Sequence, residues 1–130
     1  MTDAHQMLAR LVVAATIALL FACVWSTISA RRSAGRVDHR FAVDRLLLLV
    51  VGLVAVNGIA GLLLVAADSR PADVLHLLYG PAALITLPIG VWLSRRGRDV
   101  ASAAPARRDG WLAAATILLL GIELRLFMTG

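Results

Sequence analysis

Four long apolar runs dominate this chain, and short polar segments separate them. The runs cover residues 8–29, 46–67, 72–94 and 111–128. Each approaches or exceeds the ~20 residues that a helix needs to cross ~30 Å of hydrocarbon. Because the backbone groups of a segment in lipid must be hydrogen-bonded internally, we interpret all four runs as transmembrane α-helices. The pattern therefore predicts an all-α fold, an integral membrane four-helix bundle.

Arginine is distributed unevenly among the connecting segments. The first and third connections are rich in arginine and hold Arg31, Arg32, Arg36, Arg40, Arg45, Arg95, Arg96, Arg98, Arg107 and Arg108. The second connection holds only Arg70. The positive-inside rule places arginine-rich connections in the cytoplasm. We therefore expect an antiparallel, up-down-up-down bundle with both termini on the outer side (N-out/C-out).

Composition narrows the class of protein further. Hydrophobic residues make up 60% of the 130 residues, whereas soluble proteins have roughly 45–50%. We expect residues 1–130 to form a single transmembrane domain, because the connections are too short for a soluble catalytic domain. The formal charge of +5 comes from arginines that flank the runs. This placement favours the lipid bilayer over nucleic acid as the partner of the basic residues.

The ends of the runs carry features expected at a membrane boundary. Trp25, Trp92 and Trp111 fall near the predicted cytoplasmic ends, where interfacial tryptophans are common. Residues 68–71 read Asp-Ser-Arg-Pro, which predicts a tight turn that joins the second and third helices in a hairpin. Residues 101–108 contain repeated alanines and a proline and are interpreted as a short solvated linker.

The third run is expected to form a bent helix. Pro81 and Pro88 each lack a backbone donor, which leaves the carbonyls of Leu77 and Leu84 without a helical partner. In hydrocarbon such carbonyls need a neighbouring helix, a water or a hydroxyl such as that of Thr86. We therefore expect this helix inside the bundle or at an interface.

Small residues recur at helical spacing and predict where helices approach closely. The first run has a four-residue repeat of Ala14, Ala18, Ala22, Ser26 and Ala30. The third run offers Ala83, Thr86, Gly90 and Ser94, and the second offers Gly58 and Gly61 beside Asn57. We interpret these faces as intrachain packing surfaces, with a seam for a partner subunit as the alternative. Cys23 has no second thiol and is expected to pack in the interior.

Ionisable groups are costly in hydrocarbon, so those within the runs are candidate site residues. In the predicted orientation the outer leaflet contains Arg10, His76, Tyr79, Glu123 and Arg125. His76 could bind a haem iron, hydrogen-bond a quinone carbonyl or relay protons. Alternatively it is structural and pairs with Asp73 or Glu123. Glu123 could equally form a structural pair with Arg10 or His76, or hold a proton or ligand.

A cofactor pocket is one reading of these residues. His76, Tyr79, Glu123 and Arg10 would line a site for haem b or a quinone, and binding no cofactor is the simpler expectation. The second axial ligand to a haem iron would be His5, at the same predicted depth. Arg10 and Arg125 would then hold the propionates.

Two short segments resemble a known group of proteins. The helix opening at 75–80, Leu-His-Leu-Leu-Tyr-Gly, and the ending from Leu124 to Gly130 resemble small four-span proteins of GC-rich bacteria that have no assigned function. That resemblance implies a multi-pass protein of the bacterial cytoplasmic (inner) membrane. In size and helix number the chain is also similar to the membrane anchor subunits of respiratory complexes, but it lacks their second histidine within a helix.

Taken together, these features predict a non-catalytic accessory or assembly subunit of a larger, plausibly energy-transducing, membrane complex. Its partners would be other membrane protein subunits or a second copy of itself. A b-type haem- or quinone-binding electron-transfer subunit that uses His76 is the first alternative. A small oligomeric transporter or channel with Asn57 in its lining is the second.

Overall fold

A computed structural model of the chain describes residues 2–32, 40–67, 74–95 and 104–129. They form four helices, α1 (Thr2–Arg32), α2 (Arg40–Ala66), α3 (Val74–Arg95) and α4 (Ala104–Thr129). Each helix overlaps one predicted run, so the all-α prediction is confirmed. The turn predicted at 68–71 lies outside the described residues.

Three helices are long and apolar enough to cross a bilayer. Within the described residues these spans are Asp3–Ala30 in α1, Phe41–Ala66 in α2 and Arg108–Met128 in α4. Their outward faces carry exposed leucine, isoleucine, valine and phenylalanine side chains, which indicates association with membrane lipid. The helix α3 is not among the three. The predicted span at 72–94 therefore stays a prediction.

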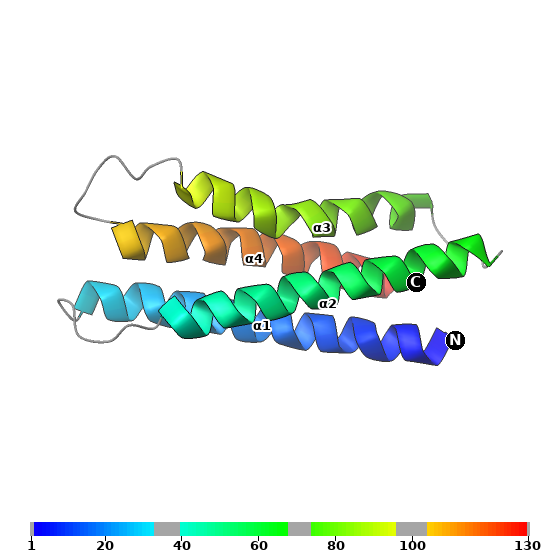
Figure 1. The fold of residues 1–130 in the computed structure, drawn as a ribbon, viewed down its shortest axis with the longest axis horizontal. Helices are drawn as coiled ribbons and strands as arrows, with labels where there is room; N and C mark the ends of the chain where they lie inside the picture. The colour runs from blue at the N-terminus through cyan, green and yellow to red at the C-terminus, as the bar shows by residue number, and fades with distance from the viewer. Residues whose placement is uncertain (1, 33–39, 68–73, 96–103, 130) are drawn as a thin grey trace.

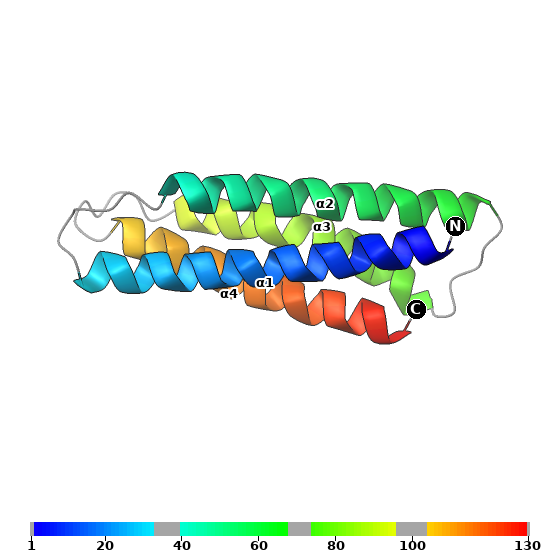
Figure 2. The same cartoon turned by 90° about the horizontal axis from the view of Figure 1, so that it is seen from below.

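The helices lie side by side along one long axis, and helices adjacent in the chain run in opposite directions (Figure 1). The helix α1 packs against α4 and α2, and α3 packs against α4. Contact between α2 and α3 is sparse, although they follow each other in the chain. Figure 2 shows the two termini at the same end of the molecule. The pair formed by α1 and α4 is therefore the part on which both other helices rest.

The interface of α1 and α4 uses alternating spacings of three and four residues. Buried positions on α1 are Val12, Thr16, Leu19, Cys23 and Ser26. Those on α4 are Asp109, Leu112, Thr116, Leu119 and Glu123. This spacing keeps one narrow face of each helix turned toward its neighbour, as in a coiled coil. The predicted packing role of Cys23 is confirmed.

The two helices also share a short sequence. Residues 14–20 read AATIALL and residues 114–120 read AATILLL, and the corresponding positions have the same burial. Thr16 and Thr116 occupy equivalent buried positions in this repeat. Because α1 and α4 run in opposite directions, the repeat makes their interface similar when viewed from either end.

The four-residue stripe on α1 is not the packing surface that the sequence predicted. Ala14, Ala18 and Ala30 are exposed, Ala22 is half-buried and only Ser26 is buried. A step of four residues advances about 40° around an α-helix, so the stripe winds across the helix surface. The buried face instead follows the alternating spacing described above, and the prediction for Ala14, Ala18 and Ala30 is wrong.

The small residues of α3 and α2 do meet neighbouring helices, as predicted. Ala83, Thr86 and Gly90 on α3 are buried. Gly58 faces Leu84 of α3, and Gly61 faces the His5 side chain on α1. Their absence of a side chain allows the helix backbones to approach, which favours packing in lipid.

The helix α3 continues through Pro81 and Pro88. The Thr86 hydroxyl donates to the Ala82 carbonyl at 2.6 Å. The Thr86 hydroxyl was predicted as a donor to the carbonyls that the prolines leave without a partner. It bonds a different carbonyl, so it does not fill that role. This bond is the usual one from a helical threonine to the residue four before it.

The start of α4 differs from the sequence prediction. Residues 101–108 were interpreted as a linker, but the helix begins at Ala104. Pro105 lies in the first turn, where a missing N–H leaves no intrahelical bond unmade, and the neighbouring alanines favour helix. The longer helix brings Arg108 and Asp109 into ordered positions on α4.

Gly90 marks a close approach of α3 to α4. A Cβ at this position would lie 2.5 Å from the Ala115 Cβ. We expect Gly90→Ala to lower the thermal stability of the purified protein, because overpacking costs ~1–3 kcal/mol. The gain in helix propensity, ~1 kcal/mol, only partly offsets that cost. The second substitution Ala115→Gly should restore stability by removing the clashing atom.

Gly52 provides the matched control for this test. A Cβ there would meet nothing within 4 Å, so Gly52→Ala should leave the melting temperature unchanged or raise it. Equal melting temperatures for the Gly90→Ala and Gly52→Ala proteins in the same detergent would contradict the close approach of α3 to α4.

Candidate functional site

Buried polar side chains concentrate where α1 faces α4. Thr16, Ser26, Asp109, Thr116 and Glu123 are all buried at this interface. The rest of the face is apolar, so each polar group needs a partner within the protein. This polar seam, defined by these five residues, is the candidate site with the clearest geometry.

Glu123 lies against Thr16 on the neighbouring helix. Its side chain is 6% exposed, and Oε1 is 2.9 Å from Thr16 Oγ1. Thr16 Oγ1 is also 2.9 Å from the Val12 carbonyl oxygen. Among the described residues Oε2 of Glu123 has no hydrogen-bond partner. The carboxyl group therefore makes one contact across the interface and leaves one oxygen enclosed in the interior.

The Thr16 hydroxyl has one hydrogen but two neighbouring acceptors. If it donates to Glu123, the carboxylate gains a bond between helices. If it donates to Val12, the contact with Glu123 requires a protonated carboxyl group that donates to Thr16 Oγ1. In the second arrangement both 2.9 Å contacts are hydrogen bonds and the carboxyl group is neutral. A charged carboxylate would be more costly to bury in a water-free interior.

Asp109 forms a second polar contact at the opposite end of the seam. Its side chain is 2% exposed, and Ser26 Oγ donates to Oδ2 at 2.5 Å. The other oxygen, Oδ1, has no partner in the described part of the chain. The preceding residue, Arg108, donates a hydrogen bond to Asp44 of α2 and forms an ion pair with it. These contacts join α1, α2 and α4 at one end of the molecule.

Sequence reasoning missed Asp109 and Asp44 because both precede the predicted spans. A signal for Asp109 is nevertheless present in the sequence. It lies three residues before Leu112 and seven before Thr116, which continues the alternating spacing of the buried α4 face. Extending that spacing toward the N-terminus would have placed the carboxyl group in the interface.

Apolar side chains separate the two carboxyl groups. Asp109 and Glu123 are fourteen residues apart on α4, which corresponds to ~21 Å along the helix axis. Between them Leu19, Leu112 and Leu119 are fully buried. The two ends of the seam therefore act as separate polar contacts, and the filled centre does not favour a path for ions between them.

The residues predicted to form an outer cofactor pocket are only partly described. Arg10 is exposed on α1 and Tyr79 is half-buried on α3. His76 lies in the first turns of α3, but its side chain and Asp73 are outside the described residues. In the parts of the chain that are described, Arg10 and Glu123 form no ion pair with each other. Glu123 contacts Thr16 instead of Arg10, and its predicted pairing with His76 stays a prediction.

The remaining predicted residues lie elsewhere on the helices. His5 is half-buried, and its ring faces Gly61 of α2. Asn57 is half-buried, and its Oδ1 has no hydrogen-bond partner among residues that the structure describes. Those residues also contain no group of three or more His, Cys, Asp or Glu side chains placed to hold a metal ion. The haem and quinone assignments of His76 and His5 stay predictions.

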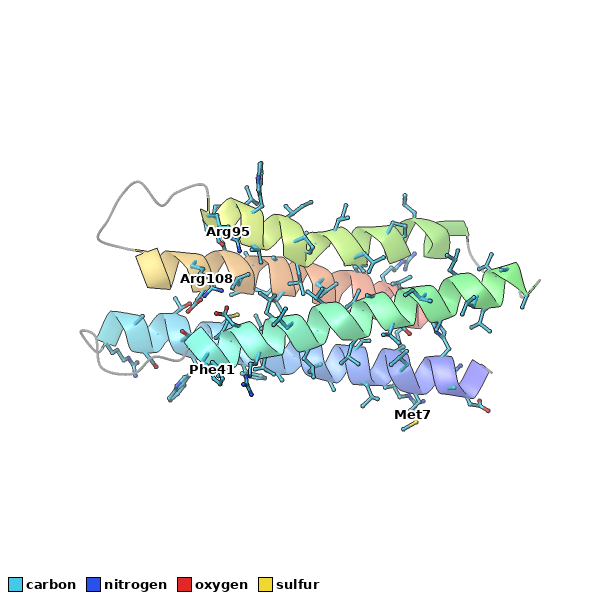
Figure 3. All side chains as sticks on the ribbon, in the orientation of Figure 1. Met7, Phe41, Arg95 and Arg108 are labelled. Atoms are coloured by element: carbon cyan, nitrogen blue, oxygen red, sulfur yellow. The ribbon has the colours of Figure 1, made fainter. Side chains whose placement is uncertain are left out.

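The arginine-rich end of the molecule agrees with the predicted pattern. Arg32, Arg45, Arg95 and Arg108 all lie where α1 and α3 end and α2 and α4 begin. Figure 3 shows Phe41, Arg95 and Arg108 at this end and Met7 toward the other. The Arg45 guanidinium lies 4.1 Å from the centre of the Phe41 ring. Basic and aromatic side chains therefore gather at one end, as they do where helices meet lipid headgroups.

Comparison with known proteins identifies no relative for this chain. No protein-family model, no curated protein and no solved structure matches it.

The contact between Thr16 and Glu123 predicts a measurable coupling between helices. Thr16→Val removes the hydroxyl and keeps the shape of the side chain, so it should destabilise the purified protein. In a double-mutant cycle with Glu123→Leu we expect a coupling of ~0.6–2 kcal/mol, the range for hydrogen bonds within membranes. The measurement is unfolding in mixed micelles, followed by circular dichroism.

Two control substitutions show whether the coupling is specific to the contact between Thr16 and Glu123. Thr116 is the equivalent residue of the repeat, and its hydroxyl donates to Leu112 of its own helix at 2.7 Å. Thr116→Val should therefore show little coupling to Glu123. Glu123→Gln keeps a donor for Thr16 and should retain most of the stability. A coupling near zero for Thr16 would refute the contact between helices.

Proposed function

We propose that the chain is a four-span protein of the bacterial cytoplasmic membrane, a four-helix bundle with both termini outside. Three apolar helices of sufficient length support insertion. The fourth span would be α3, which packs on α4 and lies along the same long axis as the other helices, antiparallel to α4. The gathering of arginines at one end supports a cytoplasmic location for that end.

Within that membrane we propose a non-catalytic role as an accessory or assembly subunit of a larger complex. The main observation in favour of this role is that Ala14 and Ala18 are exposed on the outer face of α1. Small side chains give little contact to lipid tails, but they allow a second helix to approach closely. The α1 face that contains them therefore suits a helix from a partner subunit.

The interior of the chain also favours a structural role. Its buried polar groups are used to join helices, through the pairs Thr16–Glu123 and Ser26–Asp109. Leu19 and Leu119 are fully buried between these pairs. The buried groups thus hold the helices together, and the outer surface is left for partners in an energy-transducing or other membrane complex.

Bulk on the alanine face tests the proposed role. We expect the tagged chain, extracted in a mild detergent, to elute in a complex larger than a monomer or simple homodimer. The double substitution Ala14→Leu and Ala18→Leu should release it from that complex, because leucine keeps a partner helix at a distance. Size-exclusion chromatography with mass spectrometry of the eluted subunits measures this.

The control substitution is Ala42→Leu on α2, which also adds a leucine at an exposed alanine. This variant should stay in the complex. Since Ala14, Ala18 and Ala42 are all exposed, none of the three changes should alter the thermal stability of the purified chain. Recovery of the unmodified chain only as a monomer or homodimer would count against an accessory role.

A further inference from the structure

The sparse contact between α2 and α3 leaves a groove near the arginine-rich end. Its volume is about 400 Å³, within the ~300–1,000 Å³ typical of ligand sites. The walls are Leu47, Leu48 and Val51 from α2 and Leu87, Pro88 and Val91 from α3. All six side chains are apolar, so the groove would accept hydrocarbon.

The sequence of α3 explains why the groove is present. Its small face, with Ala83 and Gly90, turns toward the interior, and Gly90 draws the helix close to Ala115 of α4. The helix is therefore held against α4 and is left with few contacts to α2. Pro88 lines the groove. Its nitrogen carries no hydrogen, so it makes no helical bond to the Leu84 carbonyl.

One end of the groove is polar and cationic. Trp92 and Arg95 complete its lining, and both side chains are exposed. They lie in the last turn of α3, at the end of the molecule where arginines gather (Figure 3). In the described residues Arg95 takes part in no ion pair. An apolar groove is thus continuous with a cation at the arginine-rich end of the molecule.

We propose that this groove binds one anionic glycerophospholipid from the arginine-rich leaflet. The acyl chain would lie between α2 and α3, against Val51 and Leu87. The phosphate would meet the Arg95 guanidinium, whose forked donors match phosphate oxygens. Charge complementarity selects an anionic lipid, because a zwitterionic headgroup offers Arg95 no net charge. The proposal needs the chain to be in a membrane but is independent of its partner complex.

Native mass spectrometry of the intact chain tests the proposal. The protein is released from micelles that contain phosphatidylglycerol or phosphatidylcholine of the same acyl chains. We expect one phosphatidylglycerol to stay bound in preference to phosphatidylcholine. Arg95→Gln should lower the apparent affinity for phosphatidylglycerol about tenfold, the effect of losing one charge-assisted hydrogen bond. Val51→Trp should abolish binding by filling the groove.

Matched variants separate the groove from general effects of charge and bulk. Arg32→Gln removes an exposed arginine at the same end of the molecule but outside the groove. Val56→Trp adds the same bulk to an exposed position of α2 away from it. Both should bind phosphatidylglycerol like the unmodified chain. Circular dichroism establishes that Val51→Trp keeps its helices.

Three results would overturn the proposal. The first is equal retention of phosphatidylcholine and phosphatidylglycerol, which would remove the role of charge. The second is unchanged binding in Val51→Trp, which would place the lipid elsewhere. The third is displacement of the lipid by glycerol 3-phosphate at equal concentration, which would indicate a site for a soluble phosphate without a need for the acyl chain.

Discussion

Association of α1 with α4 is the contact on which the rest of the structure depends. Lipid tails are as apolar as leucine, so helices in a membrane gain little from hiding apolar surface. Close packing and hydrogen bonds between helices must hold them instead. The α1/α4 interface has both, with buried side chains at alternating spacings of three and four residues along its length and a carboxyl–hydroxyl pair toward each end. The helices α2 and α3 then pack on this pair and scarcely on each other.

This arrangement gives the molecule two kinds of surface. The α1/α4 interface is filled and internally hydrogen-bonded, whereas the boundary between α2 and α3 is open enough to form a groove. On the outside, α1 exposes Ala14 and Ala18 beside larger apolar side chains such as Leu11 and Phe21. A lipid and a partner helix would thus meet different faces, and occupancy of one need not exclude the other.

Much of the helical fold could be predicted from the sequence, because a long apolar run leaves few alternatives in hydrocarbon. The packing faces of α3 were also predictable, since Gly90 and its neighbours recur at a spacing that keeps one side of the helix small. The buried face of α1 could not be predicted in this way. Its alanine repeat is regular but winds around the helix, and the larger residues Val12, Leu19 and Cys23 define the buried side. The contact between Glu123 and Thr16 was not predictable either, because a carboxyl group in hydrocarbon suggests a charged partner and a neutral hydroxyl gives no such signal.

The pairing of the first helix with the last has a consequence for biosynthesis. Thr16 and Glu123 are separated by 107 residues. At ~5–20 residues per second the ribosome needs about 5–20 s to make the intervening chain. During that interval the face of α1 that later packs against α4 has no partner helix. Thr16, Cys23 and Ser26 on this face are then not covered by α4. The α1 face is therefore covered by its own chain only after α4 has been made.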